Sequence, residues 1–463
     1  MSGEPLRHEE ALVDYAERAL EHLAGEGQVT LVHERSLTSR FARSRPTQAT
    51  EVDDLSVHLL CVRDGQTGSA VINSLDDGQL AAAAGRALAA AQAGAGAGPG
   101  DYPGLADPAP PPEYGGHDPR TARLDPAEAG AALEAAFEEA ARSGLEAFGI
   151  WSAGEVTTAI ASTTGVHVEQ AVTDAYLKVI CRDAGGRSGF ASDAAVASAA
   201  LDARGVARRA AAKVSSQDAV ALAPGEYTVV LAPEAVGTLL EFLAGLAFNG
   251  LAHVEGRGAL AGRLGTQVAH PEINLADAPR HPHTLPRSFD AEGVPKRPLP
   301  LIQDGVAYRV AHDRRSAARA GGGTASTGHA LAPGGDLGGP RPTNLVLAGG
   351  GCSGERELME GIERGLYVTR LWYVNVVQDG QTLLTGVTRD GTFLIEDGEL
   401  TRPVRGQRFT DSVLGLLRRT EALTAGVRLV CEGDFYGRRF ATGVLCPALR
   451  AHGFRITGTA PDG

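Results

Sequence analysis

The residues of this chain that could carry out chemistry by themselves are a few histidines and cysteines. His281 and His283 are separated by one proline, and with His270, His329 or Cys431 they could in principle bind a metal. No spacing in the sequence forces these groups to converge, and ordinary loop histidines explain the pair better. A metal site at this point therefore remains an alternative interpretation.

A second reactive group is the thiol of Cys352, which lies in the glycine-rich run 349–354. A helix is predicted to follow from Glu355 to Gly365, and a thiol at a helix N-terminus would have a lowered pKa, as a nucleophile requires. However, no lysine follows to complete a phosphate-binding loop, and no histidine or asparagine partner is identifiable. An ordinary loop that leads into a helix explains this segment better than covalent catalysis.

Two polar clusters in the second half of the chain are candidates for contact with a substrate. The predicted substrate-binding residues are Ser288, Asp290, Gly293, Gly328 and His329. Short polar residues next to glycine permit a close approach of backbones. Such an approach suits an extended peptide that pairs through its main chain with a sheet edge. The alternative is that Asp290 and Gly293 merely build a tight turn.

The elements of the first half predict helices on a largely antiparallel sheet. Helices are expected at 9–24, 77–93, 126–143 and 203–214. Strands are expected at 28–33, 55–62, 68–72, 149–153, 157–163, 166–173 and 175–182. Residues 64–65 and 164–165 have the composition and position of hairpin turns. We therefore expect an α+β domain over residues 1–220.

The second half, residues 221–463, is expected to form a β-rich domain. It opens with a strand at 226–231 that enters a helix through Pro233, where a missing N–H costs nothing. Further strands are expected at 299–304, 306–310, 344–348, 367–377, 381–388, 392–396 and 399–403. Residues 389–392 and 396–399 each contain Asp-Gly and are predicted to be hairpins. A mainly antiparallel, curled and barrel-like sheet follows from this pattern.

Composition excludes several classes of protein. The formal net charge of −13 opposes binding to a phosphate backbone, so no nucleic-acid partner is expected. The five cysteines are odd in number and scattered, which favours reduced thiols. No apolar run approaches the roughly 20 residues that cross a bilayer, and the first residues carry charge without an apolar run. We therefore expect a cytoplasmic protein with no membrane partner.

Three stretches of the second half resemble the TldD/PmbA family. They are EYTVVLAPEAVGTLLEFLA; HPHTLPRSFDAEGVPKRPLPLIQDGVAYRVAHDRRSAARAGG with TASTGHA close behind; and ERGLYVTRLW with DGTFLIEDGELTRPV and GVLCPALRAHGFRITG. They lie in family order and cover the whole second half, whereas the first half matches more loosely. The family is known for cytoplasmic zinc-dependent peptide processing, and its members were historically described as modulators of DNA gyrase.

The catalytic subunits of that family carry a helix with His-Glu-x-x-x-His, and a distant cysteine completes the metal site. The matching hexapeptide here places Pro233 and Thr238 at the two histidine positions. Proline offers no side-chain ligand and threonine only a weak neutral oxygen. Glu234 keeps the carboxylate, but a general base needs a metal-bound water. We therefore expect neither a metal nor a catalytic residue here, and Glu234 as a first-turn helix residue favoured by the dipole.

This degenerate motif is similar to the PmbA kind of subunit, also called TldE. The resemblance implies the non-metal subunit of a heterodimeric zinc metallopeptidase that processes or degrades unfolded peptides, for example in peptide maturation. It also implies a histidine-bearing TldD-like partner that holds the zinc, with no cofactor in this chain. Two alternatives stay open: a homodimeric peptide-binding protein without catalysis, and an independent hydrolase with a relocated site.

Overall fold

Two β-sheets with helices packed on them make up the protein, as a computed structural model describes it for residues 11–431 and 437–460. The first sheet has the strand order β3-β2-β1-β4-β5-β6, with every neighbouring pair antiparallel. The second sheet has eleven strands and is mixed. The predicted α+β class is confirmed. No helix in the described ranges is both long and apolar enough to cross a membrane.

The strands of the first sheet are β1 (Gly27–Ala42), β2 (Arg45–Arg63), β3 (Gln66–Ile72), β4 (Glu146–Ser162), β5 (His167–Arg182) and β6 (Ser188–Ala195). Its helices are α1 (Leu12–Leu20), α2 (Asp77–Ala97), α3 (Pro126–Arg142) and α4 (Ala203–Ala211). The 64–65 hairpin joins β2 to β3, with Asp64 and Gly65 at φ 50° and 72°. Both predicted hairpins of this half are therefore confirmed, since residues 164–165 join β4 to β5.

Strands β4 and β5 are each continuous, whereas the sequence predicted two shorter strands in place of each one. In β5 the predicted break falls at Asp174, a residue type that is uncommon in strands. The strand continues through it because the buried Asp174 carboxylate accepts two hydrogen bonds from Arg439, at 2.7 Å from Nε and 2.6 Å from Nη2. Arg439, which belongs to the second half of the chain, therefore stabilises β5 at this position.

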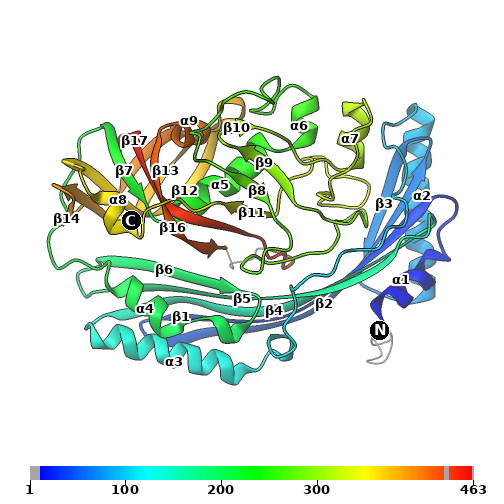
Figure 1. Ribbon diagram of the computed structural model, residues 1–463. Coiled ribbons are helices and arrows are strands. Elements are labelled where there is room, and N and C mark those ends of the chain that lie inside the picture. The colour runs from blue at the N-terminus through cyan, green and yellow to red at the C-terminus, as the bar shows by residue number, and fades with distance from the viewer. Residues whose placement is uncertain (1–10, 432–436, 461–463) are drawn as a thin grey trace.

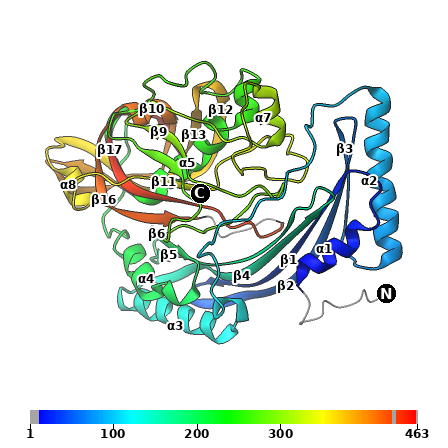
Figure 2. The same ribbon diagram turned by 45° about the vertical axis from the view of Figure 1, so that its right-hand side comes forward.

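The first sheet packs on both of its faces, as the alternation of side chains along a strand requires. Trp151 and Leu177 lie in the core formed with α3 and α4. Ile150 and Tyr176 point the other way and share a core with Leu429 and other residues of the second half. In Figures 1 and 2 the long strands accordingly form a curved layer between α3 and α4 on one side and the second half on the other.

The second sheet consists of β7 (Gly225–Leu231), β8 (Leu275–Asp277), β9 (Leu299–Gln303), β10 (Val306–Ala307), β11 (Asn344–Leu347), β12 (Arg364–Gln378), β13 (Leu383–Glu396), β14 (Glu399–Pro403), β15 (Gln407–Ser412), β16 (Thr420–Val430) and β17 (Gly443–Thr459). The helices of this half are α5 (Pro233–Ala247), α6 (Gly250–Val254), α7 (Arg314–Ala320), α8 (Glu355–Met359) and α9 (Val413–Arg418). Most pairings are antiparallel, but β7 pairs with β12 and β11 with β17 in parallel. The sheet is therefore mixed and curled, and "barrel-like" describes it only loosely. Helix α5 packs in its core through residues such as Leu239 and Leu243.

One predicted hairpin of the second half is wrong. Residues 389–392 lie inside the continuous strand β13, where Asp390 and Gly391 have φ values of 55° and 121°. The register with β12 shifts between Val368 and Arg370, so the Asp-Gly pair forms a bulge rather than a turn. The hairpin at 396–399 is confirmed as the connection between β13 and β14. The domain boundary near residue 220 stays a prediction.

Candidate functional site

Helix α5 begins at the degenerate motif, Pro233, Glu234 and Thr238. Pro233 is the first helical residue, and the hydroxyl of Thr238 donates to the carbonyl oxygen of Glu234 at 2.9 Å. The Glu234 side chain is 3% exposed, and its Oε1 accepts a hydrogen bond from Nη1 of Arg428 in β16 at 3.1 Å. Its Oε2 is buried without a hydrogen-bond partner among the described residues. The carboxylate thus pairs with a guanidinium.

The neighbours of this turn leave little free space around it. A Cβ on Gly237 would lie 2.6 Å from the Cβ of Val430, so α5 packs directly on β16. The buried thiol of Cys446 donates to the carbonyl oxygen of Pro233 at 3.4 Å. Burial, and secondarily the charge of Glu234, raises the pKa of this thiol far above its usual range. Cys446 is therefore a protonated packing residue, unlike a metal-binding thiolate.

The predicted substrate-binding residues come together between the two halves of the chain. A cavity of about 160 Å³ lies there, lined by Asp290, Gly328 and His329 together with strand residues such as Gln170. Ser288 lies beside it, since both its backbone N and its Oγ donate to Oε1 of Gln170 at 2.8 Å. The structure therefore places three of the five predicted residues in the wall of one cavity, and a fourth, Ser288, is bonded to a residue of that wall.

The fifth residue, Gly293, belongs to a turn that uses the carboxylate of Asp290. Oδ1 of Asp290 accepts from the backbone N of Glu292 at 2.9 Å and of Val294 at 3.0 Å, and Oδ2 accepts from Ala330 N at 2.9 Å. Gly293 has φ 77°, where glycine is favoured. The tight turn that was the alternative reading is thus present. Peptide binding by these residues stays a prediction.

His329 is held at both of its ring nitrogens. Its Nε2 lies 3.0 Å from Oδ2 of Asp277, and its Nδ1 lies 2.9 Å from the hydroxyl of Thr327. Lys296 lies 3.6 Å from the same Asp277 oxygen and donates to Gly328 O at 3.1 Å. Burial would raise the pKa of Asp277, but the charges of Lys296 and His329 hold it well below its usual range. His329 is therefore a structural group, without a nitrogen left for a metal.

Two further carboxylates of this region have pKa values close to neutral. Burial raises the pKa of Asp290 to about 6, and burial together with the charge of Asp290 raises the pKa of Glu292 to about 8. Glu292 accepts from the hydroxyl of Tyr102 at 3.1 Å and from the backbone N of Arg314 at 3.0 Å. Such groups could hold or move a proton at physiological pH. Glu292 was not among the predicted substrate-binding residues, although it lies in the same polar segment as Asp290.

The two alternative reactive groups are not supported by the geometry. His281 and His283 have ring centroids 5.7 Å apart, but the clusters of possible metal ligands found within the described ranges do not include them. The helix predicted at 355–365 ends at Met359, so α8 is only five residues long. Burial and the charge of Glu357 raise the pKa of Cys352. The covalent alternative required a lowered pKa at Cys352, and the direction found is the opposite.

Comparison with known proteins identifies the family. Residues 224–458 match the family model described as "PmbA/TldA metallopeptidase C-terminal domain", and residues 120–217 match its central domain. The first match alone spans half of the chain. The protein belongs to the TldD/PmbA family. The resemblance noted in the sequence is thus confirmed, and the family relationship extends into the first half.

Relatives within the TldD/PmbA family are similar at low identity. A metalloprotease of Methanothermobacter thermautotrophicus is 28% identical over 205 residues, which cover 44% of each chain. A TldD homologue of Haemophilus influenzae, named as a metalloprotease, is 26% identical over 268 residues, 56% of this chain and 54% of that one. The matched part therefore spans about half the length of these curated relatives.

Solved structures of similar proteins share the fold over nearly the whole chain. TldE from Thermococcus kodakarensis aligns with a TM-score of 0.83 and 21% identity, and covers 96% of this chain and 99% of its own. A putative modulator of DNA gyrase from Thermotoga maritima aligns with a TM-score of 0.82 and 21% identity, over 96% and 100%. At this identity the likeness establishes the TldD/PmbA fold.

Proposed function

We propose that this protein is the non-metal subunit of a heterodimeric zinc metallopeptidase, acting on unfolded peptides in the cytoplasm. The observation that carries the proposal is the first turn of α5, where the metal-binding motif of the catalytic subunits has become Pro233, Glu234 and Thr238. In place of metal ligands, this turn contains a carboxylate that is paired with Arg428.

The donor set at this turn does not fit zinc. Structural and catalytic zinc sites need three or four nitrogen, sulfur or carboxylate ligands. Pro233 supplies no side-chain donor, and the hydroxyl proton of Thr238 is used by a backbone carbonyl. A guanidinium beside Glu234 adds a positive charge where a second cation would be repelled. No catalytic step is therefore assigned to a metal in this chain.

The role left to this subunit is to hold and guide the peptide while a histidine-bearing TldD-like partner supplies the zinc. The cavity beside Asp290 and His329 lies between the two halves of the chain, which is a usual position for a binding site. Polar lining residues such as Asp290 and His329 already bond to backbone or side-chain groups of the chain itself. The chain would therefore contribute shape and backbone contacts, and the partner would contribute bond cleavage.

An apolar surface on the outer end of β12 supports the proposal of a partner. Tyr373 is 78% exposed, Val377 53% and Val376 40%, and all three lie near the end of one strand. Apolar side chains gathered in this way mark a surface that another protein covers. Because β12 reaches beyond the core that surrounds α5, a second subunit could pack against it.

The decisive experiment is co-expression of this chain with a TldD-like subunit that has the intact histidine motif. Native mass spectrometry should detect a one-to-one pair with about one zinc, and this pair should cleave an unstructured peptide that neither the chain alone nor its zinc-free partner cleaves. Two other functions would give different results in this experiment. A homodimer that binds the peptide without cleaving it would favour a binding protein, and cleavage by the chain alone would favour an independent hydrolase.

A further inference from the structure

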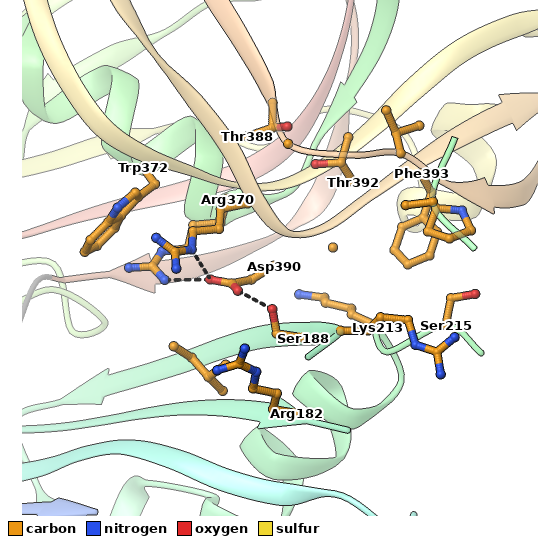
Figure 3. Close-up of a pocket in the computed structure, with 18 of the residues that line it drawn as sticks. Arg182, Ser188, Lys213, Ser215, Arg370, Trp372, Thr388, Asp390, Thr392 and Phe393 are labelled. Carbon is orange, nitrogen blue, oxygen red and sulfur yellow. Dashed lines mark hydrogen bonds and ion pairs between the residues drawn. The ribbon is translucent and has the colours of Figure 1, made fainter. Parts of the chain in front are cut away.

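A second cavity shares no lining residue with the one around His329. It has a volume of about 500 Å³ and lies between β5 and β6 of the first sheet and β12 and β13 of the second (Figure 3). Six cationic side chains line it: Lys178, Arg182, Arg187, Lys213, Arg370 and Arg389. Among the described lining residues Asp390 is the only carboxylate. This concentration of positive charge is notable because the whole chain has a formal charge of −13.

One of these cations is fixed in place by the bulge in β13. Nη1 of Arg370 lies 3.0 Å from Oδ2 of Asp390, and the guanidinium lies over the rings of Phe190 at 4.2 Å and Trp372 at 4.5 Å. Asp390 also accepts a hydrogen bond from Ser188 in β6 at 2.6 Å. Figure 3 shows these groups facing one another between the strands of the two halves. The bulge thus places Asp390 in the wall of the cavity. Its carboxylate forms a close ion pair with one arginine, Arg370.

Arg187 pairs with Oδ2 of Asp183 at 2.6 Å, whereas Arg182 and Arg389 have no carboxylate of their own within the described part of the chain. The exposed side chain of Arg182 makes no ion pair or hydrogen bond within the described part of the chain. Arg389 lies 4.0 Å from Asp390, which already pairs with Arg370. Nζ of Lys213 donates to the carbonyl of Phe190 at 3.0 Å; burial lowers the pKa of this lysine, and the charges of Glu234 and Glu355 oppose that lowering. Because these cationic side chains line one cavity, an anion inside it would be attracted by several charges at once.

A buried hydroxyl in the same wall also lacks a partner. Thr392 follows the bulge, is 4% exposed and lines the cavity, and its Oγ1 has no hydrogen-bond partner in the described ranges. Buried polar atoms in native proteins are nearly always bonded to protein, water or ligand. The hydroxyl of Thr392 would therefore add a hydrogen bond to an oxygen of the same anion.

We propose that this cavity binds a small organic polyanion, recognised through phosphate or carboxylate oxygens by Arg182, Arg389 and Lys213. The cavity volume falls within the range of small-molecule sites, and the arginine forks fit both kinds of oxyanion. The site is separate from the proposed peptide-holding role. It adjoins strands of both sheets, so an occupant would contact the two halves of the chain at once.

Isothermal titration at low salt tests the proposal with pyrophosphate, ADP and citrate as probes and adenosine as the uncharged control. We expect saturable binding of at least one anion, weakened by added salt, and no binding of adenosine. The two phosphate probes against citrate distinguish a phosphate site from a carboxylate site. Arg182→Gln combined with Arg389→Gln removes two charges from partly exposed positions, and should weaken binding by about 10- to 100-fold.

The matched control is Arg86→Gln, which makes the same kind of change at an exposed position of α2, a helix on the other side of the molecule from β6 and β13 in Figure 1. This variant should bind as the wild type does. Thermal unfolding of each variant without ligand confirms that the fold is intact. Equal affinity of the double variant and the wild type for every anion, or no binding of any anion to the wild type at millimolar concentration, would overturn the proposal.

Discussion

Glu234 and Arg428 form an ion pair that uses only one oxygen of the carboxylate. Nη1 of Arg428 lies 3.1 Å from Oε1, whereas Oε2 is buried without a partner among the described residues. The two residues are 194 positions apart in the chain, so the pair ties the start of α5 to β16. A guanidinium stays protonated at neutral pH and offers no labile water. The cation beside Glu234 therefore provides neither a nucleophile nor a route for a proton.

Glu234→Gln should leave peptide cleavage by the reconstituted pair within a few-fold of the wild type. The glutamine keeps an oxygen for Arg428 and replaces an unpartnered oxygen, so we expect a stability change of only about 0.3–1 kcal/mol. Urea unfolding and single-turnover cleavage measured on the same variant check both parts. A loss of about 100- to 10,000-fold in cleavage without unfolding would identify Glu234 as a general base and contradict the proposal.

Arg428→Ala should cost more stability than Glu234→Gln, although it removes the other half of the same pair. It leaves a carboxylate that is 3% exposed without its cation, at a cost of about 1–3 kcal/mol after allowance for the 32% exposure of Arg428. The surface pair of Arg356 and Glu399, exposed at 79% and 66%, supplies the control, since Arg356→Ala should change stability little. Equal losses in all three variants would contradict this ranking.

The purified chain alone should contain less than one zinc per molecule. Pro233 and Thr238 cannot replace two imidazoles, and Arg428 repels a second cation beside Glu234. Elemental analysis after mild chelation measures the metal content. Stoichiometric zinc would restore the alternative site at His281 and His283, and its loss on His283→Ala would locate it there.

Much of the fold could be predicted from periodicity, but a dipeptide alone did not distinguish a turn from a bulge. Asp-Gly at 397–398 connects two strands, whereas Asp-Gly at 390–391 lies within one strand. Both favour positive φ, and only the partner strands decide which structure forms. Likewise, the polar Asp174 suggested the end of a strand because its partner Arg439 lies 265 residues away.

The candidate site, like the fold, could be predicted only in part. The sequence identified Asp290 and His329 because short polar residues near glycine have a local signature. It did not identify Arg428 as the partner of Glu234, or the raised pKa of Glu292, because both depend on contacts between distant segments. The cationic cavity was missed for the same reason, since its lining comes from strands of both sheets.

Protein stability should fall as the pH rises from about 5 to about 8, because Glu292 must then ionise in a buried position. Burial and the charge of Asp290 raise the pKa of Glu292 from 4.5 to about 8. The folded state therefore binds more protons than the unfolded state between these values, and its stability is lost as the pH rises. Glu292→Gln should be more stable than the wild type at pH 8 by about 1–3 kcal/mol and should flatten the profile.

Urea unfolding at several pH values measures this difference. Glu113→Gln is the control, because Glu113 is exposed and should leave the pH profile unchanged. A wild-type profile that rises between pH 5 and pH 8, or that Glu292→Gln leaves unaltered, would show that Glu292 is ionised in the folded protein without cost.

The last prediction concerns the apolar surface of β12, which we expect to lie in the interface of a dimer, with this chain or with a TldD-like partner. Val376→Glu combined with Val377→Glu would place two charges in that interface, where unpaired charges are strongly unfavourable. Both valines are partly exposed, at 40% and 53%, so the change should leave the fold of the single chain intact. Light scattering coupled to size exclusion should detect a dimer for the wild type and a monomer for the double variant.

Leu337→Glu provides the control for this surface, because Leu337 is 91% exposed and lies outside β12. It adds a charge at another exposed apolar residue and should leave the dimer intact. Thermal unfolding separates loss of assembly from loss of fold, since a folded monomer still unfolds cooperatively. A wild type that stays monomeric at micromolar concentration with and without the partner would refute a β12 interface, as would a double variant that still pairs.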